Sequence, residues 1–166
     1  MKILVMSDTH SDSAVITQVI GQNPDVNAVF HCGDSELAYT APELSGVYKV
    51  RGNCDHDVDF PTEVVEEIDG HKIFMTHGHL FNVKSSLTAL SFRAKEVQAD
   101  IVLFGHSHVL GVELVDGVLY VNPGSLLLPR GRKEKSFAVI ENIENGWHIL
   151  FYTEEKNVIE EKTLLY

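Results

Sequence analysis

A chain of 166 residues can bury a hydrophobic core, and a composition of 44% hydrophobic and 22% charged residues is typical of a folded globular protein. Its formal net charge of −11 argues against a nucleic-acid polymer or an anionic membrane as partner, because both bind surfaces rich in Lys and Arg. No apolar run is long enough for a membrane span or a signal peptide, and the spacing of Cys32 and Cys54 does not indicate a disulfide scaffold. We therefore expect one domain over residues 1–166, located in the cytoplasm.

The first part of the chain has the pattern of a parallel α/β unit. Short apolar runs at residues 2–6 and 28–31 predict buried strands, and residues 47–50 predict a third. Between the first two runs, residues 13–20 predict an amphipathic helix. Its apolar residues recur at helical spacing: Val15, Ile16, Val19 and Ile20. A strand, a helix and a strand in this order predict parallel pairing through a right-handed crossover.

From residue 62 onward the sequence is typical of antiparallel hairpins. Three two-residue turn signals separate pairs of strand-like runs: Asp69-Gly70, Asp116-Gly117 and Asn145-Gly146. They predict hairpins over residues 62–76, 112–121 and 137–153. Residues 84–97 predict a second helix, and residues 101–104 a further strand. A parallel first half and a largely antiparallel second half are both accommodated by two packed sheets with helices outside them.

Five of the apolar runs end directly in groups that bind metals. The endings are Asp8-Thr9-His10, Gly33-Asp34, Gly52-Asn53, His77-Gly78-His79 and His106-Ser107-His108. Residues i and i+2 on extended backbone face the same way, so three of these endings can each present two groups to one point. Any one pair is more often solvated polar surface than a ligand set. Five of them at strand ends, where sites of α/β sheets collect, predict a metal site.

These motifs, in this order and with this rough spacing, resemble those of the calcineurin-like metallophosphoesterases. The resemblance covers residues 1 to about 125, and the third motif, Gly52-Asn53-Cys54-Asp55, is similar to that of the small YfcE-type phosphodiesterase branch. The resemblance implies a four-layer α/β/β/α sandwich of two mixed sheets flanked by helices. It also implies two divalent metal ions at the strand ends.

Carried over position by position, the resemblance implies two ligand sets that share one carboxylate. The first metal ion would be held by Asp8, His10, Asp34 and His108. The second would be held by the bridging Asp34 together with Asn53, His77 and His106. Mixed carboxylate, amide and imidazole ligands favour borderline cations, Mn first and Ni, Fe or Zn as alternatives, over Ca or Mg. Two such ions clamp both oxygens of an in-line displacement and generate a hydroxide from a shared water.

The predicted function is hydrolysis of a small phosphodiester by a dinuclear metal centre, with a metal-bridging hydroxide as nucleophile. A phosphomonoesterase is the chemically adjacent alternative. A protein-interaction scaffold, like the retromer subunit that shares this fold, is the alternative from another class. A scaffold tolerates lost ligands, and the presence of all seven favours the enzyme. The sequence leaves open the natural substrate, the physiological metal and whether the chain forms a homo-oligomer.

Two positions depart from the family pattern. The family commonly has a histidine after the ligand asparagine, where this chain has Cys54, and an aspartate where it has Leu37. The histidine would protonate the leaving group, which typically contributes a factor of about 10²–10⁴. His79 takes this role if it faces the site, and is a surface histidine otherwise. We therefore name Asn53 and His79 as the catalytic residues and expect Cys54 to be a packed thiol beside the ligands.

Overall fold

The first strand, β1 (Lys2–Met6), is apolar and buried on both faces in the computed structural model, which describes all 166 residues. Side chains alternate along a strand, so Ile3 and Val5 point to one side and Leu4 and Met6 to the other. The second pair packs against helix α1 (Ser13–Gly21), which begins at the predicted residue. A strand with two apolar faces needs a layer on each side, and this requirement sets the architecture.

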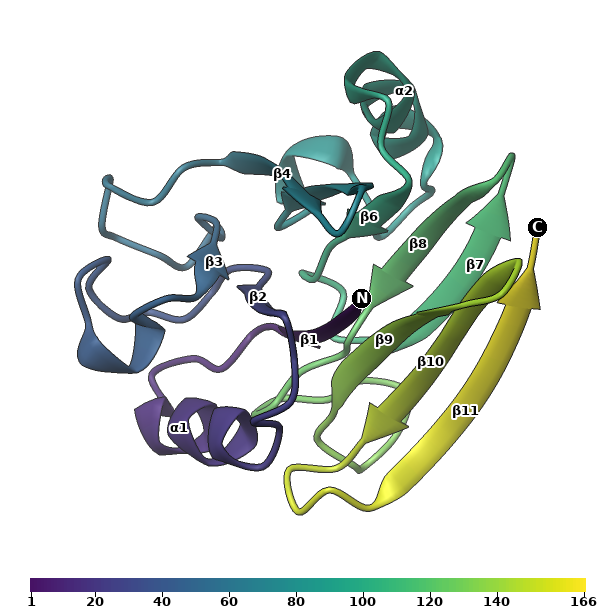
Figure 1. The fold of residues 1–166 in the computed structure, drawn as a ribbon. Helices are drawn as coiled ribbons and strands as arrows, with labels where there is room; N and C mark the ends of the chain where they lie inside the picture. Colours follow the sequence, from purple (N-terminus) through teal and green to yellow (C-terminus); the bar gives the residue numbers. More distant parts are fainter.

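The larger sheet is mixed, as predicted. Besides β1 it contains β2 (Ala28–His31), β3 (Tyr48–Lys49), β9 (Phe137–Ile143), β10 (Gly146–Tyr152) and β11 (Val158–Leu165). The strand order is β11-β10-β9-β1-β2-β3. β1, β2 and β3 run parallel, whereas β9, β10 and β11 continue the sheet as an antiparallel meander (Figure 1).

The smaller sheet is also mixed. It contains β4 (Glu63–Ile68), β5 (His71–Thr76), β6 (Ile101–Leu103), β7 (Gly111–Val115) and β8 (Val118–Asn122), in the order β4-β5-β6-β8-β7. The hairpins β4–β5 and β7–β8 are antiparallel, but β5, β6 and β8 run parallel, which the hairpin pattern did not predict. The cause is helix α2 (Thr88–Val97), which carries the chain back across the sheet so that β6 starts at the same end as β5.

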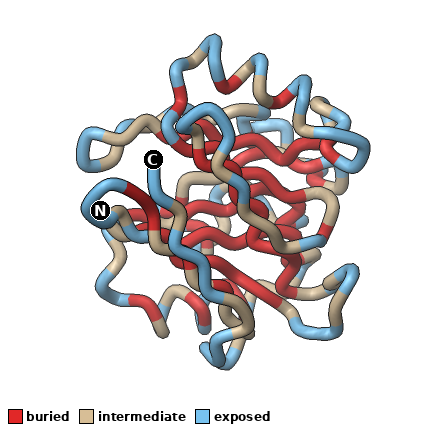
Figure 2. The backbone as a smooth tube through the Cα atoms, turned by 90° about the vertical axis from the view of Figure 1, so that its right-hand side faces the viewer, coloured by how far each residue is buried: buried red, intermediate tan, exposed pale blue.

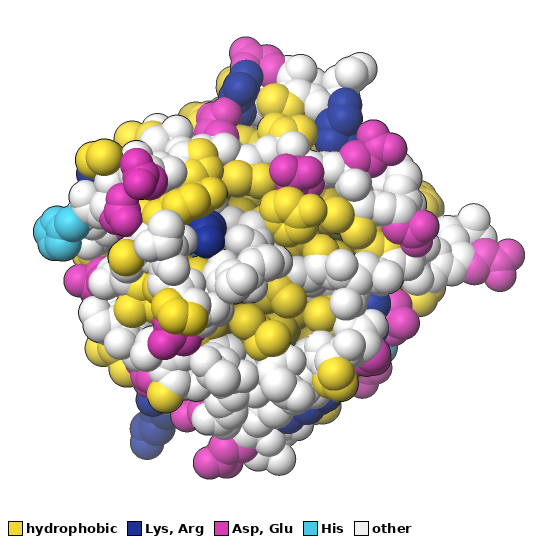
Figure 3. Space-filling model, turned by 60° about the vertical axis from the view of Figure 1, so that its left-hand side comes forward, with side chains coloured by type: hydrophobic (Ala, Val, Ile, Leu, Met, Phe, Trp, Pro, Cys, Tyr) yellow, Lys and Arg dark blue, Asp and Glu magenta, His cyan; other side chains and the backbone are white.

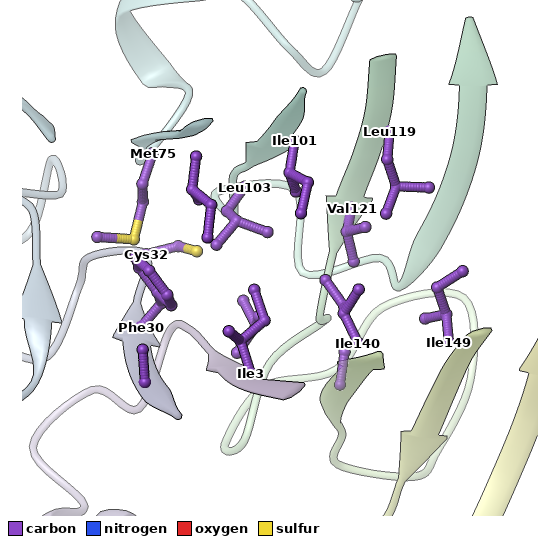
Figure 4. Packing of buried hydrophobic residues seen from close by; sticks show 14 of the residues in the cluster. Ile3, Phe30, Cys32, Met75, Ile101, Leu103, Leu119, Val121, Ile140 and Ile149 are labelled. Atoms are coloured by element: carbon purple, nitrogen blue, oxygen red, sulfur yellow. The ribbon is translucent and has the colours of Figure 1, made fainter. Parts of the chain in front are cut away.

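The central core lies between the two sheets. Figure 4 shows Ile3 and Phe30 of the larger sheet pointing toward Met75 and Leu103 of the smaller one. The central strands of both sheets are mostly buried, whereas the edge strands β4, β7 and β11 are more exposed (Figure 2). Separate clusters hold α1 and α2 against the outer faces. The predicted four-layer α/β/β/α sandwich is confirmed. None of the helices combines the length and apolar character that a membrane span requires.

The second helix is shorter than predicted. It begins at Thr88 and not at residue 84, because the preceding residues form local turns. Asn82 has a left-handed backbone, the Ser85 hydroxyl donates to its side chain, and the Ser86 hydroxyl accepts from the backbone N–H of Thr88. Such side-chain bonds compete with helical hydrogen bonds and delay the start of a helix.

Two other predictions were wrong at the C-terminal end of the larger sheet. The strand β11 was not predicted, and the third hairpin turns at Glu144 and Asn145 instead of at Asn145-Gly146. The two differences have one cause. Gly146 pairs with Leu165 of β11, and Asn145 accepts a hydrogen bond from the N–H of Tyr166, so the extra strand draws Gly146 into the ladder.

The central core should carry much of the folding free energy. Phe30 is fully buried and stacks on Tyr48 at 5.0 Å between ring centroids, whereas Phe92 on α2 is 66% exposed. We expect Phe30→Ala to lower the unfolding free energy by about 3–5 kcal/mol and the matched control Phe92→Ala to change it by less than about 0.5 kcal/mol. Urea unfolding curves measure both. Equal losses would contradict the assignment of the core.

Candidate metal centre

The metal-binding endings meet at one edge of the sandwich because the parallel strands of both sheets end there. The loops after β1 and β2 are tied by backbone hydrogen bonds, from Asp8 N–H to Gly33 O and from His10 N–H to Asp34 O, both 3.0 Å. The loop after β6 is tied to the loop after β5 in the same way, from Gly105 N–H to His77 O at 2.9 Å. The edge is therefore a continuous network of loops contributed by both sheets.

The paired ligands are not on extended backbone, as the i, i+2 argument assumed. The backbone is left-handed at these residues: Asp8, His10, Asp34, His106 and His108. His79 lies in the 3₁₀ helix η2 (His79–Phe81). The chain turns sharply after each strand. This turn, and not the alternation of side chains along a strand, points both members of a pair toward the same place. Left-handed conformations of non-glycine residues cost about 1–3 kcal/mol each and collect at functional sites.

The first group of side chains surrounds the buried carboxylate of Asp8. Its Oδ1 lies 3.0 Å from Nε2 of His108 and 3.8 Å from Nε2 of His10, and these two nitrogens are 3.3 Å apart. His108 is oriented from behind, because its Nδ1 donates to Leu128 O at 2.7 Å. His10 is oriented by Glu36, whose carboxylate lies 2.9 Å from its Nδ1. Both imidazoles therefore present Nε2 to one point.

The second group surrounds His77. Its Nδ1 donates to Cys32 O at 2.7 Å, so its Nε2 faces the site. This nitrogen lies 3.1 Å from Asn53 Oδ1, 3.3 Å from Asp34 Oδ2 and 3.9 Å from Asp8 Oδ1. The ring of His106 is 5.1 Å from that of His77, and the ring of His79 lies 5.4 Å from it. The structure thus brings all seven predicted ligands and His79 to one edge.

The donor set fits a metal. With Nδ1–H bonded to a carbonyl, His108 and His77 both direct Nε2 at carboxylate oxygens. Asp8 Oδ1 is buried and accepts no hydrogen bond from a backbone or hydroxyl group. These oxygens and nitrogens need positive charge between them, supplied by protons on the imidazoles or by a metal ion. The ligand atoms of Asp8, Asp34 and His77 all lie within 4.8 Å of one another, close enough to share an ion.

Protons and metal ions compete for the ligands of this site. Burial alone raises the pKa of Asp34, but its hydrogen bond with His77 and the backbone N–H of Cys54 lower it more, so the carboxylate is ionised well below neutral pH. Burial and the neighbouring His77 lower the pKa of His106 to about 4, which leaves that imidazole neutral. Burial lowers the pKa of His77, but its hydrogen bond with Asp34 raises it more, and the hydrogen bond with Asp8 raises the pKa of His108. Neutral imidazoles coordinate metals, so metal binding would displace the protons of His77 and His108.

Asp55 organises the loops, a role that the sequence did not reveal. Its Oδ2 accepts from the backbone N–H groups of Asp34 at 2.8 Å and Gly52 at 2.7 Å, and its Oδ1 accepts from Glu36 N–H at 2.7 Å. Gly52 has no room for a side chain, since a Cβ there would lie 2.0 Å from Asp34 Oδ1. One buried carboxylate thus fixes Asp34 against the loop that carries Asn53. In the sequence, the only feature that indicates this role of Asp55 is its position beside the Gly52-Asn53 motif.

Cys54 and His31 also lie at the centre. The Cys54 sulfur is within 4.8 Å of ligand atoms of His10 and Asp34, and burial followed by the charge of Asp34 raises the pKa of the thiol to about 11. It is therefore a neutral thiol beside the ligands, as expected. His31 is buried, and its Nε2 lies 3.0 Å from the Thr9 hydroxyl. Ser125, which follows β8, donates to Asp8 O at 2.8 Å.

The arrangement predicts that Asp55 controls both stability and metal binding. Asp55→Asn replaces a carboxylate oxygen by an NH₂ group that faces a backbone donor, so we expect the unfolding free energy to fall by about 1–3 kcal/mol and Mn²⁺ affinity to fall with it. The exposed Asp59, whose side chain makes no such contacts, provides the control Asp59→Asn. Urea unfolding and calorimetric Mn²⁺ titration measure both effects. Wild-type values for Asp55→Asn would contradict the role.

Comparison with known proteins agrees with this geometry. The chain is 38% identical over 162 residues to a probable metallophosphoesterase, YsnB, of Bacillus subtilis, covering 97% of this chain and 96% of that protein. Phosphodiesterase YfcE of Escherichia coli K12 is 34% identical over 104 residues, 58% of this chain and 53% of YfcE.

Solved structures share the fold. A crystal structure of a conserved uncharacterized protein from Streptococcus pneumoniae TIGR4, described as a predicted phosphoesterase, superposes with a TM-score of 0.96 at 37% identity, covering 99% of this chain and 97% of that one. Zinc-bound Vps29 of Entamoeba histolytica superposes with a TM-score of 0.74 at 21% identity and 99% coverage of both chains, which shows the fold alone. The model of the calcineurin-like phosphoesterase superfamily domain matches residues 1–145. The chain therefore belongs to the calcineurin-like phosphoesterase superfamily.

Proposed function

We propose that this protein hydrolyses a small phosphodiester at a dinuclear metal centre. The observation that carries the proposal is the convergence of imidazole nitrogens and the Asp34 carboxylate on a buried oxygen, Asp8 Oδ1, that no backbone or hydroxyl donor reaches. Asp34 is the proposed bridge, because its carboxylate lies in one group with Asp8 and His77 and in another with His10 and Cys54. The curated relatives with the words phosphodiesterase or metallophosphoesterase in their names support the same reaction class.

Some residues of the site would hold the metal ions, and others orient the imidazoles that bind them. Two divalent ions held there, Mn first among the candidates, would activate a water and neutralise charge that builds on the phosphoryl oxygens. Asn53 reaches the site through Oδ1, and its NH₂ group donates one hydrogen bond to Cys54 Sγ at 3.5 Å, so its second N–H is available to a substrate oxygen. Glu36, Leu128 and Cys32 orient the imidazoles and thereby limit the reorganisation that metal binding requires.

The site has no strong general acid to protonate the leaving group. Cys54 is a neutral thiol, which donates hydrogen bonds poorly and carries no positive charge. His79 lies beside the cluster, but burial and the charge of His77 lower its pKa, so its imidazole is mostly neutral at pH 7. We infer that leaving groups depart with little protonation, which favours substrates with acidic leaving groups.

The two alternative functions, a phosphomonoesterase and a protein-interaction scaffold, predict different properties. A phosphomonoesterase would hydrolyse monoesters faster than diesters at the same centre. A scaffold on this fold, the other alternative, would not need the seven converging ligands, and their full retention disfavours it. The two cysteines are unpaired, and we therefore propose that the protein works in the reducing cytoplasm.

Metal dependence is the first test of the function. Chelation should abolish hydrolysis of bis(p-nitrophenyl) phosphate, and Mn²⁺ should restore it and raise the melting temperature, because ions bind the folded site. The same protein should hydrolyse p-nitrophenyl phosphate more slowly. Faster turnover of the monoester would favour a phosphomonoesterase, and full activity in chelated protein would refute the metal mechanism.

Leaving-group dependence tests the role of Cys54. With no effective acid, the logarithm of the rate should fall steeply as the leaving-group pKa rises across a series of aryl and alkyl diesters. Cys54→His places an imidazole where the thiol was and should flatten that slope, while Cys54→Ser, which adds no cation, should not. Metal content is measured for each variant. A shallow slope in the unmodified protein would show that another group, His79 first, already protonates the leaving oxygen.

A further inference from the structure

A cleft of about 340 Å³ opens beside the candidate centre and shares only Asn53 with the candidate metal ligands. Its walls include the ligand Asn53, the neighbouring His79, and Arg51, Thr62 and Leu80. Asn53 and His79 connect it directly to the site, because their side chains lie against the ring of His77. A phosphodiester bound at the centre therefore has one of its two ester groups beside or inside this cleft.

The cleft contains one positive charge, Arg51, which forms no ion pair with the cleft's one carboxylate, Asp55. Arg51 is half-buried, and its Nε donates to the backbone oxygen of Asp55 at 3.3 Å. No carboxylate lies within 4 Å of its guanidinium, whereas Arg93 and Arg132 pair with glutamates. The nearby carboxylate of Asp55 is already bound to backbone N–H groups. The outer N–H groups of Arg51 are therefore free.

Of the four arginines in this chain, which has 24 acidic and only 13 basic residues, Arg51 and the exposed Arg130 have no acidic partner, and Arg51 alone lines the cleft. On the face shown in Figure 3, acidic side chains are spread around apolar areas, and basic ones are sparse. A half-buried guanidinium has lost part of its hydration, and an anion restores the lost interactions best when it accepts two parallel hydrogen bonds. Two oxygens of a phosphate group can accept these two hydrogen bonds from the planar guanidinium group. The charge of Arg51 also reaches His79, where it contributes to the lowered pKa.

We propose that this cleft binds a second phosphate, carried by one ester group of the substrate, through Arg51. The proposal rests on the proposed function and narrows its substrate class to small phosphodiesters that bear an additional phosphate monoester. Arg51 is then a specificity-determining residue. Its position is fixed by its own backbone, whose N–H donates to Pro61 O at 2.7 Å, and by the bond from Nε to Asp55, so the fork needs little reorganisation to bind.

The test compares two substrates that differ only in the second phosphate. The p-nitrophenyl ester of thymidine 5′-phosphate is hydrolysed with and without a 3′-phosphate, in Mn²⁺. Wild-type protein should have the higher kcat/KM for the 3′-phosphorylated substrate. Arg51→Gln should lose about tenfold on that substrate and less than about twofold on the other, because only one contact is removed. Arg51→Lys, which keeps the charge without the fork, should lie between.

Arg130 provides the matched control. It is exposed, has no acidic partner and follows the loop that orients His108, but it does not line the cleft. Arg130→Gln removes the same charge near the centre and should leave the ratio of the two kcat/KM values unchanged. Metal content and melting temperature are measured for every variant, since a disturbed Asn53 loop would affect both substrates equally.

Binding provides a readout independent of turnover. Titration calorimetry should show that wild-type protein binds thymidine 3′,5′-bisphosphate about tenfold more tightly than thymidine 5′-phosphate, and that Arg51→Gln removes the difference. Equal losses on both substrates, or no preference in the wild-type protein, would overturn the proposal. If neither substrate is hydrolysed, the proposed function fails, and the calorimetric comparison alone decides whether the cleft binds phosphate.

Discussion

One oxygen of the buried Asp8 carboxylate, Oδ1, has no backbone or hydroxyl hydrogen-bond donor, and the imidazoles of the site are arranged around this oxygen. The other oxygen is satisfied by the Ser7 hydroxyl at 2.6 Å and by the backbone N–H of His106, whereas Oδ1 faces only imidazole nitrogens. An ionised group in such surroundings is costly unless a cation compensates it. Asp8 follows β1, the strand buried on both faces, so this cost arises at the edge of the sandwich where the loops of both sheets meet.

The loops carry backbone strain that the surrounding hydrogen bonds must offset. Asp34 is left-handed, yet Asp55 accepts from its N–H and Cys54 donates to its side chain at 2.8 Å, so its geometry is set on both sides. Gly52 permits this close approach because any side chain would collide with the Asp34 carboxylate. Strain of this kind holds ligands near their working positions before any ion arrives. With the ligands held in this way, we propose that the cleft wall that contains Arg51 selects the substrate.

The apolar strands and the candidate ligands that follow them were predictable because both are encoded locally. The apolar run before Asp8 and the Gly-His pair at Gly105 are visible in sequence, and so was the sandwich. The left-handed turns were not, since tertiary bonds such as that from His10 N–H to Asp34 O impose them. β11 was missed because it is an edge strand with mostly exposed, charged residues. The role of Asp55 depends on hydrogen bonds to backbone N–H groups, and the proposed role of Arg51 depends on its place in the cleft wall. Neither contact can be inferred from the spacing of residues in the sequence.

The central claim is that two metal ions share the Asp34 carboxylate. Crystals grown in Mn²⁺ and measured at the manganese absorption edge test it most directly, because anomalous scattering locates the ions independently of the protein. We expect two peaks about 3.5–4 Å apart with the Asp34 carboxylate between them, one peak beside His10 and His108 and the other beside His77 and His106. A single peak, or two peaks without Asp34 as a common ligand, would contradict the account.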